Sequence, residues 1–213
     1  PVFEQPPAIP DDHPLAAVIQ FAIDEQQYLR RKVQSVRCRL TKRERIDGEL
    51  QKNQFLDMNL QEEIRTGDDI ERPMRVFLSF LGPGEVTGRK VLFVEGENSG
   101  KMLVRKGGKR FNYAIVRIGP TSDNAQRESL VPITELGFCR LLARQINILE
   151  THARIDPQGE NTEVGYSADA KINGRRCELI RVTHAKKQPG LTFHVANVYI
   201  DATLHVPVRI DAS

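Results

Sequence analysis

Tryptophan is absent from the 213-residue sequence, and aromatic residues make up only 6% of it. Surfaces that stack nucleic-acid bases need aromatic side chains set among basic ones, and the 31 basic residues barely outnumber the 28 acidic ones. No apolar run approaches the roughly 20 residues that a membrane-spanning helix needs. The sequence therefore argues against a nucleic-acid partner and against a transmembrane segment.

Cysteine is scarce. Cys38, Cys139 and Cys177 stand far apart, with no CxxC spacing. A zinc knuckle needs closely spaced pairs, so we expect no metal at these residues. They can form at most one intramolecular disulfide, which the sequence leaves open. The favoured interpretation is three small, buried hydrophobic side chains.

Motifs for catalysis and cofactors are also missing. There is no GxSxG nucleophile elbow, and no two of the five histidines stand at HxH or HxxxH spacing. The spacing of His194 and His205 is compatible with facing positions on neighbouring strands, an arrangement more often structural than metallic. The segment 96–101 resembles a phosphate-binding loop but lacks its final Ser or Thr and leads into a strand, so we expect a hairpin turn. No cofactor is expected.

The bulk composition is that of a folded protein, with 39% hydrophobic and 28% charged residues. Four prolines fall within the first ten residues. We therefore expect a flexible lead-in over residues 1–12 and a single domain over residues 13–213.

Two amphipathic helices are predicted from apolar residues at helical spacing. The first covers about 13–32, with Asp11 or Asp12 as its N-cap. The second covers about 134–152, with Thr134 as its N-cap.

Alternating apolar and polar residues predict strands elsewhere. Asp47-Gly48 is a strong signal for a two-residue hairpin, and short turns predict that residues 33–118 form a consecutive antiparallel meander. Four more strands are expected at about 161–171, 176–184, 192–200 and 204–210. The predicted fold class is α+β and mainly β: a long curved antiparallel sheet forming an unclosed half-barrel, with the two helices on its concave side.

Several strands are apolar on both faces. Leu92 and Val94 alternate with Val91 and Phe93, so we expect both faces to be covered. We also expect strand residues and the second helix to line one shared apolar interior that binds a ligand. The predicted lining residues are Leu56, Met58, Val76, Leu78, Phe93, Tyr113, Leu142, Ile146, Phe193, Val195 and Tyr199.

Arginines at positions 37, 39, 43 and 45 share one parity at the start of the meander. A charged strand face usually means exposure to solvent, which is the favoured interpretation. The alternative is a contact with an anion or a phospholipid headgroup.

Several stretches of the sequence resemble one bacterial family. They are GRKVLFVEG at 88–96, Asn98, GKMLV at 100–104, VPITELG at 131–137, CELI at 177–180, YID at 199–201 and PVR at 207–209. The family is a domain of unknown function of exported proteins, and its layout is similar to that of the LolA and LolB lipoprotein carriers. The resemblance implies export to the periplasm or cell envelope, removal of a signal peptide, and a hydrophobic ligand such as a lipid or acyl chain.

The leading hypothesis is a non-catalytic binding protein of the bacterial envelope that holds a hydrophobic ligand in an apolar half-barrel cavity. One alternative is a scaffold with a filled core that docks to another envelope protein through a sheet edge. The other is an enzyme acting on an envelope substrate, with its residues assembled from distant strands.

Overall fold

The computed structural model describes residues 9–67, 69–108 and 113–213. Most of the expected lead-in, residues 1–8, lies outside the described residues. The chain forms two compact units, one of residues Arg30–Leu141 and one of the residues up to Leu29 together with Leu142–Ser213. The expectation of a single domain stays a prediction.

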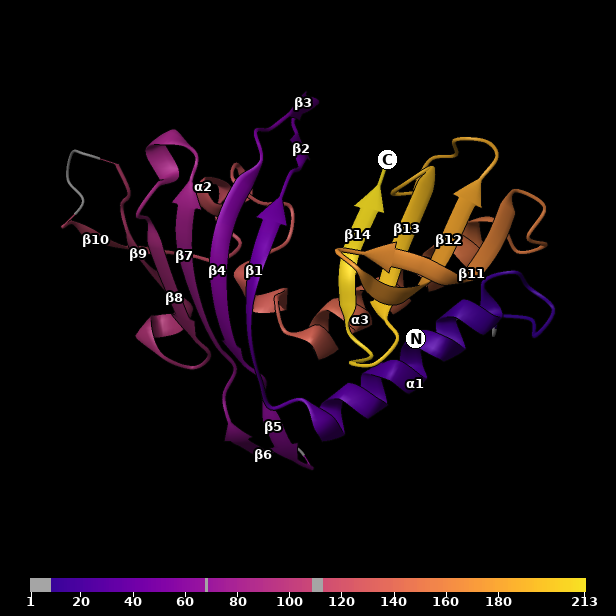
Figure 1. The fold of residues 1–213 in the computed structure, drawn as a ribbon, viewed down its shortest axis with the longest axis horizontal. Helices are drawn as coiled ribbons and strands as arrows, with labels where there is room; N and C mark the ends of the chain where they lie inside the picture. The colour runs from indigo at the N-terminus through magenta and orange to yellow at the C-terminus, as the bar shows by residue number, and fades with distance from the viewer. Residues whose placement is uncertain (1–8, 68, 109–112) are drawn as a thin grey trace, which may run out of the picture. The chain divides into compact units, whose positions relative to one another are not determined.

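The unit Arg30–Leu141 is built on a six-stranded antiparallel sheet in the order β1-β4-β7-β8-β9-β10 (Figure 1). The strands are β1 (Ser35–Lys42), β4 (Gln54–Gln61), β7 (Arg75–Gly82), β8 (Lys90–Val94), β9 (Met102–Arg105) and β10 (Ile115–Ile118). Spatial order follows chain order, so the predicted meander is confirmed. Asp47 and Gly48 both have positive φ, which a tight hairpin turn requires, and they connect β2 (Arg45–Ile46) to β3 (Glu49–Leu50).

One face of this sheet carries a packed hydrophobic core. Alternate residues of each strand point into it, as a period of two requires. Its buried members are Leu56, Met58, Leu60, Met74, Val76, Leu78, Val91, Phe93, Val104 and Ile133. The other face is open: Leu92 is 37% and Ile115 is 64% exposed. The expectation that both faces are covered is therefore wrong here, because that face mixes its apolar residues with exposed charges such as Arg37 and Lys90.

Some elements of this unit were not predicted. They are the hairpin of β5 (Ile64–Thr66) and β6 (Asp69–Arg72), the short helix α2 (Asp123–Gln126), and the 3₁₀ turns Gly84–Val86 and Ile133–Glu135. The segment 96–101 forms the turn between β8 and β9, with a 3₁₀ turn at Asn98–Gly100, as expected.

The second unit contains a four-stranded antiparallel sheet in the order β11-β12-β13-β14. The strands are β11 (Thr162–Ile172), β12 (Arg175–His184), β13 (Val195–Asp201) and β14 (Pro207–Ala212), close to the four predicted. The α+β, mainly β class with unclosed antiparallel sheets is confirmed. One long sheet was predicted, whereas the main strands of the described residues form a six-stranded and a four-stranded sheet. Within the described residues no α-helix lies between the strands of either sheet, whereas α2 and α3 (Phe138–Ile155) separate β10 from β11.

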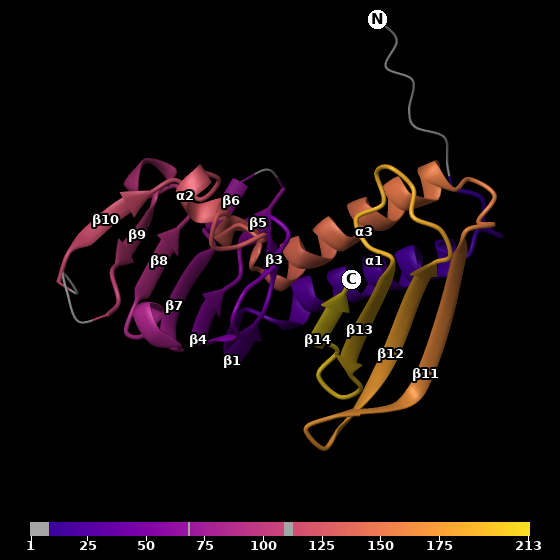
Figure 2. The ribbon, with the colours of Figure 1, turned by 90° about the horizontal axis from the view of Figure 1, so that it is seen from above.

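Helices α1 (Ala16–Lys32) and α3 cover one face of the four-stranded sheet (Figure 2). The core between them is buried: Leu15, Ile19, Leu149, Ala153, Ile180, Val182 and Ile200. The boundary between the units falls within each helix, after Leu29 and after Leu141. No helix in the described part of the chain is long and apolar enough to span a membrane.

Candidate functional site: an apolar pocket beneath α1 and α3

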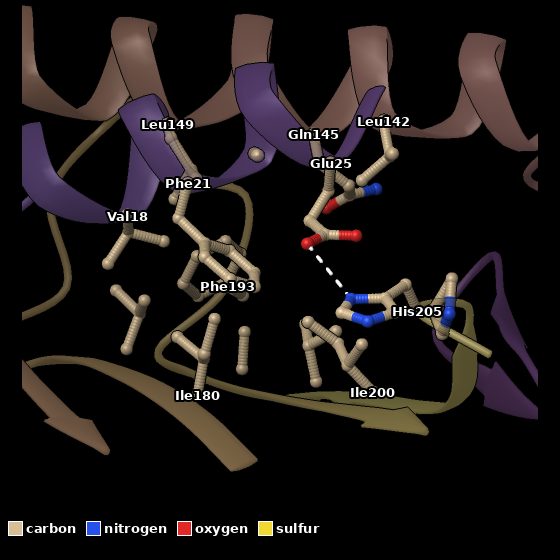
Figure 3. Close-up of a pocket in the computed structure, with 15 residues that line it drawn as sticks. Val18, Phe21, Glu25, Leu142, Gln145, Leu149, Ile180, Phe193, Ile200 and His205 are labelled. Atoms are coloured by element: carbon tan, nitrogen blue, oxygen red, sulfur yellow. Dashed lines mark hydrogen bonds and ion pairs between the residues drawn. The ribbon is translucent and has the colours of Figure 1, made fainter. Parts of the chain in front are cut away.

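A cavity of about 80 Å³ lies between the two helices and the four-stranded sheet (Figure 3). Most of its lining is aliphatic or aromatic, and its polar members are Glu25, Gln145 and His205. The lining residues are Val18, Phe21, Ala22, Glu25, Leu142, Gln145, Leu149, Ile180, Val182, Phe193, Ala196, Val198, Ile200, His205 and Pro207.

Helical and strand periodicity place these side chains together. Val18, Ala22 and Glu25 stand at i, i+4 and i+7 on α1, which is one face of a helix. On β13, Ala196, Val198 and Ile200 alternate onto the face toward the helices. The pocket is therefore built by two helix faces and one sheet face.

The size of the cavity limits what it holds in this conformation. Pockets for whole small molecules usually measure ~300–1,000 Å³, whereas dry apolar cavities of ~150 Å³ accept molecules such as benzene. At about 80 Å³, the cavity admits a short apolar segment. A longer chain enters only if a helix moves away from the sheet.

The Glu25 carboxylate lies at the pocket with one oxygen satisfied and the other not. Glu25 Oε1 accepts a hydrogen bond from His205 Nδ1 at 3.3 Å, drawn as the dashed line in Figure 3. Glu25 Oε2 is buried and has no hydrogen-bond partner within residues 9–67, 69–108 and 113–213, and the side chain is only 15% exposed. A buried carboxylate oxygen without a donor is costly.

The turn between β13 and β14 holds His205 in position. Its φ is +55°, a conformation that non-glycine residues rarely adopt, and its N–H donates to the Asp201 carbonyl at 2.9 Å. Asp201 Oδ1 also accepts the N–H groups of Thr203 and Leu204, and Arg175 donates to Asp201 Oδ2 at 2.9 Å. The hydrogen bond from Arg175 is the main cause of the lowered pKa of Asp201.

A network of buried, hydrogen-bonded side chains lies beside the pocket. The rings of His152 and His184, both fully buried, are joined from Nδ1 to Nε2 at 2.9 Å. His184 Nδ1 lies 3.2 Å from Thr162 Oγ1, and Thr162 Oγ1 donates to Asp156 Oδ2 at 2.7 Å. The ring of Phe193, which lines the pocket, lies 4.7 Å from that of His152.

The donor and acceptor of each hydrogen bond in this buried network follow from one backbone donor. The Thr192 N–H donates to His152 Nε2 at 3.0 Å, so the proton of the neutral ring is on Nδ1 and is donated to His184. His184 in turn donates from Nδ1 to Thr162. Burial lowers the pKa of His152 to about 4 and also lowers that of His184. Both rings are neutral at pH 7 and closed off from solvent, which fits a structural network.

Charged residues near the start of α3 are also structural. Glu62 Oε1 accepts the Phe138 N–H at 2.5 Å, and burial raises the pKa of Glu62. Arg140 forms ion pairs of 2.7 Å with Glu63 and with Glu95. The pKa of Glu63 is lowered to about 2, chiefly by its hydrogen bond from Arg65. These contacts attach the start of α3 to the strands of the same unit.

The predicted lining residues divide between two cores. Leu142 and Phe193 line the pocket, and Ile146 packs against the surrounding cluster. Five others lie in the core of the six-stranded sheet: Leu56, Met58, Val76, Leu78 and Phe93. The predicted set is thus divided between the cores of the two units, and Tyr113 is 78% exposed.

The parity of β13 was assigned to the wrong face. Val195 and Tyr199 share a parity with Asn197, whereas Ala196, Val198 and Ile200 line the pocket. The polar Asn197 in the first set is the sequence signal that could have identified the inward face. Glu25 was also missed, although a carboxylate within the apolar stripe of α1 was a signal that could have drawn attention to it.

The four arginines that share a parity at the start of the meander do not make one set of contacts. Arg37 and Arg39 are exposed on β1, where Arg39 donates to Asp57 at 2.9 Å. Arg43 and Arg45 donate instead to the carbonyls of Gln51 and Gly48. These are contacts of a solvated surface and of a hairpin.

The remaining expectations concern histidine and cysteine. The pairing of His194 with His205 is wrong, because His194 lies beside Ser213 and His205 lies near Asp201, at opposite ends of the β13–β14 hairpin. Cys38, Cys139 and Cys177 form no disulfide with one another. Within the described ranges, no three His, Cys, Asp or Glu side chains are grouped to hold a metal ion.

Residues 33–213 match the family described as "Protein of unknown function (DUF1571)", and the chain belongs to that family. The predicted resemblance to a family of unknown function is thereby confirmed. No curated protein matches the chain.

Three solved structures show limited similarity. A DUF1329 family protein from Desulfovibrio piger is 16% identical with a TM-score of 0.39, covering 94% of this chain and 73% of that one. A putative outer membrane lipoprotein-sorting protein domain from Vibrio parahaemolyticus is 10% identical with a TM-score of 0.39, covering 90% and 70%. A LolA superfamily protein from Nitrosomonas europaea is 8% identical with a TM-score of 0.31, covering 89% and 68%. Similarity at these TM-scores carries no argument about what this chain binds.

Proposed function

We propose that this member of a family of unknown function is a non-catalytic binding protein that holds an apolar chain between α1, α3 and the four-stranded sheet. The observation that carries the proposal is the cavity itself, with twelve of its fifteen lining residues apolar. Burying apolar surface there favours a lipid, an acyl chain or another hydrophobic ligand. We also propose a location in the periplasm or cell envelope, which rests on the sequence resemblance.

A non-catalytic role is supported by the burial and hydrogen bonding of two histidine side chains. The histidines with lowered pKa, His152 and His184, are fully buried and bonded at both ring nitrogens. An acid–base catalyst must come within hydrogen-bond reach of its substrate. These groups are better suited to fixing the wall of the pocket than to catalysis.

The scaffold alternative also has an observation in its favour. Across neighbouring strands of the six-stranded sheet, Phe77, Leu92, Leu103 and Arg117 follow one another on the open face. Apolar residues beside a basic one suit contact with a partner. The core on the other face of that sheet is packed, as a scaffold requires.

Binding of n-alkanols tests the carrier proposal. An apolar fluorescent dye is bound to the protein and displaced by alkanols of increasing length. Each buried CH₂ contributes about 0.8 kcal/mol, or roughly fourfold in affinity, until the cavity is full. A folded protein that binds no dye and shows no dependence on chain length rules the proposal out and favours the scaffold.

Leu142→Asp provides the matching variant, because Leu142 lines the cavity. A carboxylate there removes apolar contact area and adds a charge that the pocket does not solvate, so we expect alkanol affinity to fall by at least about tenfold. Ala143→Asp is the control, since Ala143 is the next residue of α3 and is exposed. Equal loss in both variants would assign the effect to the helix and contradict a role of the pocket.

A further inference from the structure

Glu25 is poorly explained by a pocket that holds only an apolar chain. Its side chain is only 15% exposed, and among the described residues Oε2 is buried without a hydrogen-bond donor. A buried carboxylate oxygen without a donor is destabilising, and an apolar side chain at this position would avoid that cost. The position therefore suggests a donor that arrives with the ligand.

The neighbouring groups leave Oε2 available. His205 Nδ1 donates to Oε1, not Oε2, and the ring of His205 is held by Tyr28, whose centroid lies 4.9 Å away. Figure 3 shows the carboxylate projecting from α1 among apolar side chains, with His205 on one side. Within the described lining of the cavity there is no lysine or arginine. A carboxylate thus faces an apolar cavity whose described lining holds neither lysine nor arginine.

This arrangement favours some amphiphile headgroups over others. A carboxylate headgroup placed here would meet a like charge in a region of low dielectric, which is unfavourable. A hydroxyl or ammonium headgroup would donate to Oε2, and a hydrogen bond between charged partners is the stronger kind. The cost of the unsatisfied oxygen would then be recovered only in the complex.

We infer that Glu25 receives a hydrogen-bond-donating headgroup, so that the ligand is an apolar chain ending in an ammonium or hydroxyl group and not a free fatty-acid anion. This inference rests on the proposed function, because it assigns the headgroup of a ligand whose chain occupies the same pocket. Glu25 is in this account a specificity-determining residue, with His205 positioning its carboxylate.

The test compares three competitors of equal chain length: decylammonium, decanol and decanoate. Each displaces a neutral apolar dye from the intact protein at pH 7, below its micelle concentration. Decylammonium and decanol are expected to compete at concentrations at least about tenfold lower than decanoate.

Glu25→Gln keeps the shape and removes the charge, so the preference for decylammonium over decanoate is expected to fall about tenfold. Decanol should keep its affinity, because the amide oxygen still accepts. Glu163→Gln, on an exposed position of β11, should change none of the three.

Each outcome decides one of the two proposals. Equal competition by the three compounds, or a stronger effect of decanoate, overturns the assignment of the headgroup while the binding of apolar chains stands. If folded Glu25→Gln keeps the preference for decylammonium over decanoate, the assignment is also overturned. Glu25 would then only hold α1 in place. If that variant does not fold, the ranking in the wild-type protein decides by itself. Failure of all three compounds and of the dye to bind overturns the proposed function, and this inference with it.

Discussion

The buried residues His152 and His184 make the stability of the fold depend on pH. The pKa of His152 is about 4 in the folded protein against an ordinary value of 6.5. Between these values the unfolded chain binds more protons than the folded one, so the free energy of unfolding falls as pH falls. The contribution is complete above pH 6.5 and is lost progressively toward pH 4.

Urea unfolding at several pH values measures this dependence. Lowering the pH from 7.5 to about 5 is expected to reduce the free energy of unfolding by about 2 kcal/mol through His152. The slope should be flatter in His152→Gln than in the wild-type protein. Equal stability at the two pH values would contradict the proton positions assigned to the network.

Gly137 is required by the carboxylate that binds the start of α3. A Cβ at this position would lie 2.8 Å from Glu62 Oε2 and 3.2 Å from Met74 Sδ. Gly137→Ala would push Glu62 away from the Phe138 N–H, which we expect to cost about 1–3 kcal/mol of stability, measured by urea unfolding. Gly119→Ala is the control, because its Cβ would make only ordinary contacts, the nearest at 3.6 Å. Similar losses in the two variants would argue against this contact.

At the scale of elements, both main helices could be predicted from apolar spacing, but not where they begin. Thr134 was expected to begin the second helix, which starts instead at Phe138. Its first N–H is bonded by Glu62, a residue of another segment of the chain. Likewise the Leu15 N–H at the start of α1 is bonded by His13 Nδ1, and not by an aspartate. The local sequence around a helix does not reveal a capping group that comes from a distant part of the chain. It also does not show whether His or Asp caps the helix when both lie near its N-terminus.

The face of β13 is the element on which the site prediction depended. The predicted residues Val195 and Tyr199 share their parity with the polar Asn197 and Asp201. A shift of one residue gives the inward residues instead, which are Ala196, Val198 and Ile200. The face of α1 was identified as apolar, but it was not assigned to the site. Of the fifteen lining residues, only Leu142 and Phe193 belong to the predicted set.

Ala196→Leu tests the assigned face of β13. The larger side chain would occupy part of the cavity of about 80 Å³, so alkanol affinity is expected to fall by at least about tenfold. Filling an existing cavity usually leaves stability unchanged or raises it, which thermal unfolding would verify. Ala168→Leu, at an exposed position of β11, should bind as the wild type does. Unchanged affinity in Ala196→Leu would place the ligand elsewhere.

At the scale of the whole molecule, connection length decided what could be predicted. Short turns fixed the antiparallel order of β1, β4, β7, β8, β9 and β10, because a hairpin allows little else. The long segment between β10 and β11 carries no such constraint, and the division into two sheets was missed. That division separates the predicted lining into two cores, of which one borders the cavity.

Methyl NMR of the protein titrated with decanol tests most directly whether the ligand occupies this cavity. The account predicts chemical-shift changes concentrated on the methyl groups that line it, namely Val18, Leu142, Leu149, Val198 and Ile200. The methyl groups of the other core provide the internal reference and should not shift: Leu56, Met58, Val76 and Leu78. Shifts confined to that second set, with the pocket methyl groups unmoved, would contradict the account.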